Sequence, residues 1–207
     1  MFIVLDGIDG AGKGRQRLEL CKYLKNRVKE LYTIDFPNHK SPIYKHLIHP
    51  ALHEEIKLNS SSWLYSFMLD QLLMADEINR AVKSKDVHFV VDGYFTTTIA
   101  YQCLMNKYFS LKQMEVLANI VKMPKPDIAI YIDVDPVTAI KRKEKEQGHD
   151  EGMDIFERSI NNQIALRKAF KRMVKEAVFC RWKEVDGMGS INEVTDQIVK
   201  VLNKFIK

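Results

Sequence analysis

The chain has 207 residues, of which 46% are hydrophobic and 29% charged, a composition typical of a folded globular protein. This length predicts one α/β domain over residues 1–207 with a sizeable core. A membrane protein is not expected, because no run approaches the roughly 18 apolar residues of a membrane span. A secreted protein is not expected either, because no secretory signal precedes the first apolar run.

The net charge and the cysteines indicate which ligands and which cellular location to expect. The formal net charge is +5 and the isoelectric point lies near 9.0, values that suit an anionic ligand. A basic, solvated surface explains the charge at least as well as nucleic-acid contact, so we expect no nucleic-acid partner. Cys21, Cys103 and Cys180 are odd in number and far apart, which indicates reduced thiols and a cytoplasmic location.

Apolar runs alternate with amphipathic segments along the whole chain. The expected strands are residues 2–5, 31–34, 87–91, 127–133 and 178–185. Helices are expected over 13–29 and 43–47, from a cap cluster at 60–62 along an apolar stripe to 75, after 93, from 110, from 135, over 154–177, and from 190. This alternation predicts a five-stranded parallel sheet with right-handed crossovers and helices on both faces.

The clearest motif follows the first strand. Residues 7–13 read Gly-Ile-Asp-Gly-Ala-Gly-Lys and fit the phosphate-binding pattern G-x-x-x-x-G-K. Glycines let backbone N–H groups surround a phosphate, and the following helix directs its positive N-terminal end at the same anion. The lysine adds a point charge for the outer phosphates. The residues expected to bind ATP are Gly7, Ile8, Asp9, Gly10, Ala11, Gly12, Lys13, Gly14 and Arg15.

Two features decide how a metal ion would be held. The Ser or Thr that usually follows the lysine and reaches Mg²⁺ is Gly14 here. Asp92 directly follows the buried third strand, where an acidic residue reaches Mg²⁺ directly or through water. A polar residue after a strand is common, but the phosphate loop favours the metal interpretation. We therefore expect Asp92 to be the magnesium residue.

Polar residues after Asp92 indicate an acceptor site. Thr96, Thr97 and Thr98 with Tyr101 and Gln102 follow a strand end, which is where open α/β sheets bind ligands. A threonine-rich helix cap with a packed tyrosine is the alternative.

A second segment suggests a cover over the phosphates. The basic run from Lys141 continues into a polar stretch that contains Gly148 and Gly152, which predicts a helical lid over about 142–153. A solvated helix end with a flexible loop is the alternative for this segment.

These motifs together resemble the thymidylate kinases, along nearly the whole chain. The matching stretches are 2–13, 36–37, 92 with 97–102, 131–136 with 139 and 142, 156–158, 185–187 and 190–194. The resemblance implies a P-loop kinase fold with a helical lid. It also implies transfer of the γ-phosphate of ATP to dTMP, giving dTDP and ADP, with Mg²⁺ as the metal ion and a homodimer as the assembly.

The resemblance also implies residue roles. Lys13 would bind the ATP phosphates, Asp92 would help to hold Mg²⁺, and Arg142 with its basic neighbours would neutralise the transferring phosphoryl group. Leu73 or a neighbour would occupy the place of the aromatic that packs on the base, and Tyr101 would crowd a 2′-hydroxyl. The implied substrate-binding residues are Asp9, Phe36, Pro37, Leu73, Arg80, Thr97, Thr98, Tyr101 and Gln102.

The chain departs from the family pattern at several arginine positions. These positions hold Asp35, Glu77 and Gly93. The loop arginine of one family branch is Gly10, so lid residues would have to supply that charge. Arg15, Lys40 and Arg80 are candidates to replace the missing arginines. The departures leave two alternatives open. The acceptor could be another monophosphate such as dUMP, or the chain could be a nucleotide-binding module with weakened catalysis. Rates across a panel of monophosphates separate these alternatives.

Overall fold

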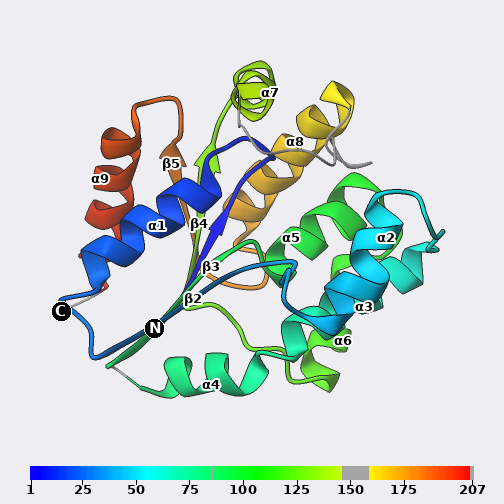
Figure 1. The fold of residues 1–207 in the computed structure, drawn as a ribbon, viewed down its shortest axis with the longest axis horizontal. Helices are drawn as coiled ribbons and strands as arrows, with labels where there is room; N and C mark the ends of the chain where they lie inside the picture. The colour runs from blue at the N-terminus through cyan, green and yellow to red at the C-terminus, as the bar shows by residue number, and fades with distance from the viewer. Residues whose placement is uncertain (85, 146–158, 206–207) are drawn as a thin grey trace.

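The computed structural model describes residues 1–84, 86–145 and 159–205. Within these ranges it contains one five-stranded parallel sheet with the order β2-β3-β1-β4-β5 (Figure 1). The strands are β1 (Phe2–Asp6), β2 (Glu30–Asp35), β3 (Val87–Asp92), β4 (Ile128–Asp133) and β5 (Trp182–Asp186). The predicted sheet is confirmed, although its last strand begins at Trp182 instead of residue 178.

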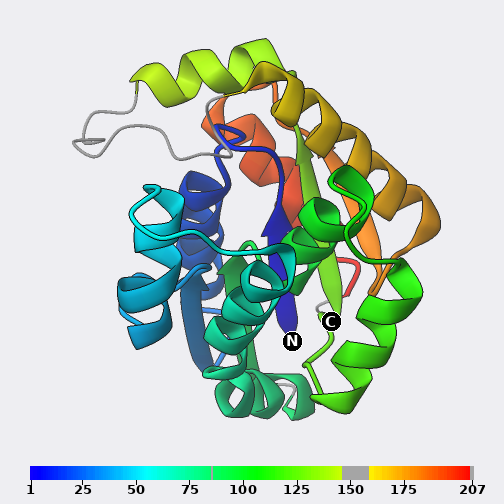
Figure 2. The same ribbon diagram turned by 90° about the vertical axis from the view of Figure 1, so that its right-hand side faces the viewer.

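Helices cover both faces of the sheet, as predicted. They are α1 (Lys13–Leu24), η1 (Tyr44–Ile48), α2 (His49–Leu52), α3 (Ser60–Leu72), α4 (Ala75–Lys83), α5 (Phe95–Ile99), η2 (Ala100–Met105), α6 (Leu111–Ile120), α7 (Pro136–Lys145), α8 (Ile160–Glu176) and α9 (Ile191–Leu202). Figures 1 and 2 place α1 and α9 on one side of the sheet and α8 on the other. The central strands β1 and β4 are therefore buried on both faces, which explains their unbroken apolar sequences.

Three predicted helix starts carry the expected caps. Ser110 with Gln113 and Ser190 with Glu193 form capping boxes at α6 and α9. Asp135 accepts hydrogen bonds from the backbone N–H groups of residues 137 and 138 at the start of α7. These local sequence signals are confirmed because each cap needs only residues within one turn of the helix.

The apolar stripe from residue 60 to residue 75 does not form one helix. The cap of α3 is Asn59, whose side chain accepts from the Ser62 N–H, so the serine cluster lies inside the helix. α3 ends at Leu72, and α4 begins as a separate helix at Ala75. α1 is also shorter than predicted and ends at Leu24, because the chain turns there to begin β2 at Glu30.

The predicted lid lies mainly outside the described residues. Its first part, residues 142–145, is the last turn of α7, and the remainder falls within 146–158. The predicted helix over 154–177 is described from Ile160 onward as α8. In the parts of the chain that the structure describes, no helix is long and apolar enough to cross a membrane.

Candidate active site

The phosphate loop connects the buried carboxyl end of β1 to the start of α1. Gly10 and Gly12 have φ angles of 80° and 86°, in the left-handed region that glycine adopts without strain. The Lys13 ammonium donates to the Ile8 carbonyl at 3.2 Å and lies 3.7 Å from an Asp9 carboxylate oxygen. These contacts hold the Lys13 ammonium beside the phosphate loop.

Close packing against α7 is a second reason why position 10 is a glycine. A Cβ atom at this position would lie 2.1 Å from the carbonyl oxygen of Ala139 in α7. The loop therefore packs directly on the backbone of α7. A loop arginine of the kind found in one thymidylate kinase branch would not fit here without moving that helix.

Two aspartates, the buried Asp6 and the half-buried Asp92, lie at the ends of the neighbouring strands β1 and β3. Asp6 accepts hydrogen bonds from the Thr96 and Thr97 hydroxyls at 2.5 and 2.6 Å. Burial raises the pKa of Asp6 to about 6, and the two hydroxyls oppose that rise. Thr96 and Thr97 thus have a structural partner, which the sequence did not reveal.

Asp92 is the second of these carboxylates. Burial raises its pKa to about 6, while the charges of Lys13 and Arg17 favour the ionised form. A Cβ atom at Gly14 would lie 3.3 Å from one Asp92 carboxylate oxygen, so the two positions face each other directly. Asp92 therefore reaches the place from which a Ser or Thr at position 14 would project.

Arg17 was missed by the sequence reasoning. Its guanidinium donates to the Thr33 hydroxyl at 2.8 Å and lies 3.8 Å from an Asp35 carboxylate oxygen. A cation from α1 thus lies beside Asp35, which stands at a position where the family usually carries an arginine. The only sequence feature that could have indicated Arg17 is its position one helical turn after Lys13.

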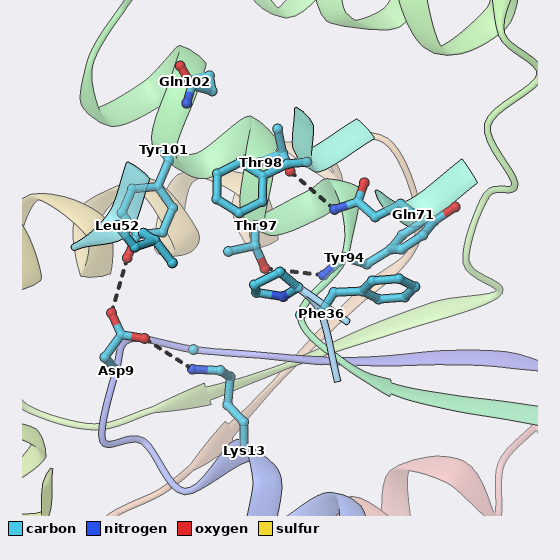
Figure 3. A pocket seen from close by; sticks show the side chains of 14 residues that line it. Asp9, Lys13, Phe36, Leu52, Gln71, Tyr94, Thr97, Thr98, Tyr101 and Gln102 are labelled. Atoms are coloured by element: carbon cyan, nitrogen blue, oxygen red, sulfur yellow. Dashed lines mark hydrogen bonds and ion pairs between the residues drawn. The ribbon is translucent and has the colours of Figure 1, made fainter. Parts of the chain in front are cut away.

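A pocket opens beside the phosphate loop, at the carboxyl ends of the strands (Figure 3). Its lining comes from the loop, from the segment after β2, and from α2, α3, α5 and η2. The lining residues are Gly7, Asp9, Lys13, Phe36, Pro37, Leu52, Phe67, Gln71, Gly93, Tyr94, Thr97, Thr98, Tyr101 and Gln102. The structure thus brings together most of the acceptor residues that the resemblance implied.

Asp9 connects the loop to two other elements. Its carboxylate accepts from the Tyr101 hydroxyl at 3.1 Å and from the Gln163 side-chain amide of α8 at 3.3 Å. Gln163 is buried and was not predicted, because its helix lies far along the chain from the loop. The position of Asp9 is therefore fixed from both sides of the pocket.

The end of the pocket away from the loop is apolar with a few neutral polar groups. Phe67 stacks on Trp63 within α3, with ring centroids 5.6 Å apart, and the Gln71 amide donates to the Thr98 hydroxyl at 3.3 Å. Phe67 belonged to a stripe expected to be mostly core, and Gln71 was overlooked. Their spacing of one helical turn was the available signal.

Two implied substrate residues lie elsewhere. Leu73 follows the last residue of α3, is 49% exposed and does not line the pocket. Arg80 is on α4, where it donates to the Tyr32 hydroxyl at 3.1 Å. Figure 1 places α4 at the opposite end of the sheet from the start of α1. These two residues lie outside the pocket because α3 and α4 are separate helices. Glu77 also lies on α4.

Two further basic residues have partners in the structure. Arg15 pairs with Glu19 at 3.0 Å on α1, and its side chain is 56% exposed. Arg142 donates to the Gly187 carbonyl at 3.0 Å, which ties α7 to the loop between β5 and α9. Arg142 therefore has a defined position on α7, the helix on which Gly10 packs.

A phosphate loop at a parallel sheet, a half-buried aspartate at the adjacent strand end and a neighbouring pocket are the features of a P-loop phosphotransferase. A family model for thymidylate kinase matches residues 5–198. The chain belongs to the thymidylate kinase family.

Named relatives agree with this family. The chain is 29% identical over 211 residues to a thymidylate kinase of Francisella tularensis subsp. tularensis (strain WY96-3418), covering 98% of this chain and 95% of that protein. It is also 29% identical over 210 residues to a probable thymidylate kinase of Methanosphaera stadtmanae, covering all of both chains.

Proposed function

We propose that this chain transfers the γ-phosphate of ATP to dTMP, giving dTDP and ADP. The observation that carries this proposal is the continuity of the acceptor pocket with the phosphate loop, because Gly7, Asp9 and Lys13 line both. A phosphate of a bound acceptor nucleotide would lie at the loop end of the pocket, and its base would lie at the end near Phe67. The names of the relatives supply dTMP as the acceptor.

The residues would act mainly by positioning and by charge. The loop amides of residues 7–14 and Lys13 would bind the ATP phosphates, with Arg15 contributing its backbone. Arg142, beside the loop through α7, would bring positive charge toward the transferring group. No general base is required, because the attacking acceptor phosphate is already an anion. Asp9, held by Tyr101 and Gln163, would orient the acceptor sugar and phosphate.

Mg²⁺ fits the site as an ion shared with the nucleotide. Among the described residues no group of three or more His, Cys, Asp or Glu side chains could hold a metal ion. Mg²⁺ commonly uses one or two carboxylates together with substrate phosphates and water. Asp92 would supply the carboxylate, and the small Gly14 leaves its oxygen accessible. When bound, the ion would neutralise charge on the phosphates.

We further propose a single domain with a lid over about 142–153, most of which lies outside the described residues. A cytoplasmic location agrees with Cys21, Cys103 and Cys180, which are free thiols.

A homodimer through α3 and α6 is also part of the proposal. Its support is an exposed apolar surface, which we call the α3/α6 face. This face consists of Tyr65, Leu69, Leu73, Val116 and Ile120. Three of these residues repeat every four positions on α3 and its end, and two do so on α6. Tyr65, Val116 and Ile120 line one shallow groove between the two helices. Exposed stripes of this size commonly mark protein–protein contacts.

An ADP-release assay tests the proposed function. With Mg²⁺-ATP and dTMP, the wild-type chain should release ADP at a rate that falls at least about a hundredfold when dTMP is omitted. Lys13→Ala should abolish the dTMP-dependent rate while its circular dichroism spectrum and melting temperature stay close to those of the wild type. Near-wild-type turnover in the folded Lys13→Ala protein would overturn the assignment of the loop.

A further inference from the structure

The base end of the pocket reads the acceptor with neutral groups. Among the described residues that line the pocket, Asp9 and Lys13 carry the only ionic side chains, and Figure 3 shows both near the phosphate loop. The polar side chains toward the other end are Gln71, Thr98 and Gln102. A base edge there would therefore meet amides and hydroxyls, which can both donate and accept hydrogen bonds.

Gln71 has an unused hydrogen-bonding atom at this place. The residue is 2% exposed, its Nε2 donates to the Thr98 hydroxyl at 3.3 Å, and its Oε1 is buried without a hydrogen-bond partner. A buried acceptor without a partner costs about 1–3 kcal/mol. A ligand that offers a donor to Oε1 would remove that cost. Gln71 is therefore poised to bind a hydrogen-bonding ligand edge.

The Gln71–Thr98 pair has no preferred amide orientation. The terminal torsion of glutamine is roughly two-fold, so a half-turn exchanges Oε1 and Nε2 at little cost. In the present orientation the Thr98 hydroxyl accepts from Nε2. After the exchange the same hydroxyl can donate to Oε1, because a hydroxyl is both donor and acceptor. One hydrogen bond can therefore join Gln71 and Thr98 in either orientation.

We propose that Gln71 reads the 3,4-edge of a pyrimidine with this reversible amide, so that the pocket accepts deoxypyrimidine monophosphates with either a 4-oxo or a 4-amino group. With thymine or uracil, Oε1 accepts from N3–H and Nε2 donates to O4. With cytosine, the exchanged amide donates from Nε2 to N3 and accepts from the 4-amino group at Oε1.

This inference rests on the proposed function, because it assumes that the acceptor base lies near Phe67 and Gln71. The test compares dUMP with dCMP, which differ at the 3,4-edge alone, by calorimetric binding to the full chain. The wild type should bind the two with affinities within about tenfold of each other, since both make two hydrogen bonds to the amide. Turnover of dTMP is measured in the same series.

Gln71→Glu is the diagnostic variant because glutamate has nearly the same shape and, when ionised, only accepts. At pH 8.5 it should weaken both dUMP and dCMP by about a hundredfold, because each base edge carries one acceptor, O4 or N3, to which a carboxylate cannot donate. Lowering the pH until the carboxyl binds a proton should restore the binding of both nucleotides, because the group then has one donor and one acceptor, and loss of structure would not produce this response. Gln71→Met should weaken both nucleotides without changing their ratio.

The experiment distinguishes failure of this inference from failure of the proposed function. A wild-type preference for dUMP over dCMP above about a thousandfold, or an affinity for either nucleotide that Gln71→Glu leaves unchanged at pH 8.5, would overturn the inference. Comparable binding of dUMP and dCMP with the predicted weakening in Gln71→Glu, but no turnover of dTMP, would support the inference and remove the proposed function instead.

Discussion

The Tyr101 hydroxyl donates to the Asp9 carboxylate at 3.1 Å and thereby fixes a phosphate-loop side chain from the helix that follows Asp92. The contact joins the two nucleotide sites, because Asp9 belongs to the phosphate loop and Tyr101 lines the acceptor pocket. A single hydroxyl group therefore contributes to the geometry between donor and acceptor.

Removing this hydroxyl should impair transfer without unfolding the chain. We expect Tyr101→Phe to lower kcat/KM for dTMP by about tenfold, since one hydrogen bond to a charged group contributes of the order of 1.5–3 kcal/mol. The aromatic ring remains, so discrimination against the ribonucleotide UMP should persist. Steady-state rates with dTMP, dUMP and UMP check both statements. Unchanged rates for Tyr101→Phe would show that the contact with Asp9 has no role in transfer.

Gly10 and Gly12 offer a matched pair for the packing of the loop on α7. Both have positive φ angles, but a Cβ atom at Gly12 would have no neighbour within 4 Å, whereas one at Gly10 would collide with the Ala139 carbonyl. Gly12→Ala should cost about 1–2 kcal/mol from backbone strain alone, and Gly10→Ala should cost clearly more. Urea denaturation of the two variants measures the difference. Equal losses would contradict the close contact between the loop and α7.

The buried Asp6 should make stability depend on pH. Its folded pKa of about 6 lies above its unfolded value, so the folded chain binds more protons than the unfolded chain between about pH 4 and pH 6. Asp6 therefore lowers the free energy of unfolding as the pH rises through this window, by of the order of 2 kcal/mol, with no further loss above it.

His88 has the opposite effect. Burial lowers its pKa to about 4, so its contribution to the free energy of unfolding increases as the pH rises above 4. The comparison of wild type with Asp6→Asn isolates the aspartate. The variant should lose only the part of this dependence that Asp6 causes, because Asp92, whose pKa burial also raises to about 6, keeps a loss of the same sign between pH 4 and pH 6. Urea denaturation at half-unit steps of pH measures the difference between the two proteins. Parallel curves for the two proteins would show that Asp6 does not titrate in this way.

The α3/α6 face should control assembly. Leu69 is 46% exposed on α3, and Leu69→Glu should convert a dimer into a monomer with little change in monomer stability. Val137 is 54% exposed on α7 and serves as the control, because Val137→Glu should leave the dimer intact. Light scattering after size-exclusion chromatography measures both. A wild-type chain that is monomeric at high micromolar concentration would remove the dimer from the account.

The sequence predicted the sheet and the loop because their signals are local. Apolar runs at β1, β3 and β4 and the glycines of residues 7–12 need no distant residue for their interpretation. The capping boxes at Ser110 and Ser190 are of the same kind. Contacts between segments far apart in the chain were not accessible in this way. Gln163 reaches Asp9 from α8, and Arg17 meets Asp35 across two elements.

The expected substrate residues Leu73 and Arg80 lie outside the pocket for a particular reason. The apolar stripe continues in sequence past Leu72, but the helix does not, so counting turns to Leu73 and Arg80 followed a helix that ends. Phe67 and Gln71 face the pocket because they lie one turn apart before that end. Only the position of the helix end distinguishes these two choices.

The most direct test of the central claim follows the phosphoryl group itself. The full chain is incubated with Mg²⁺ and ATP labelled in its γ-phosphate, with dTMP as acceptor, and the products are separated by chromatography. The account predicts labelled dTDP in a one-to-one ratio with ADP. Label recovered only as inorganic phosphate, with no labelled dTDP, would contradict it.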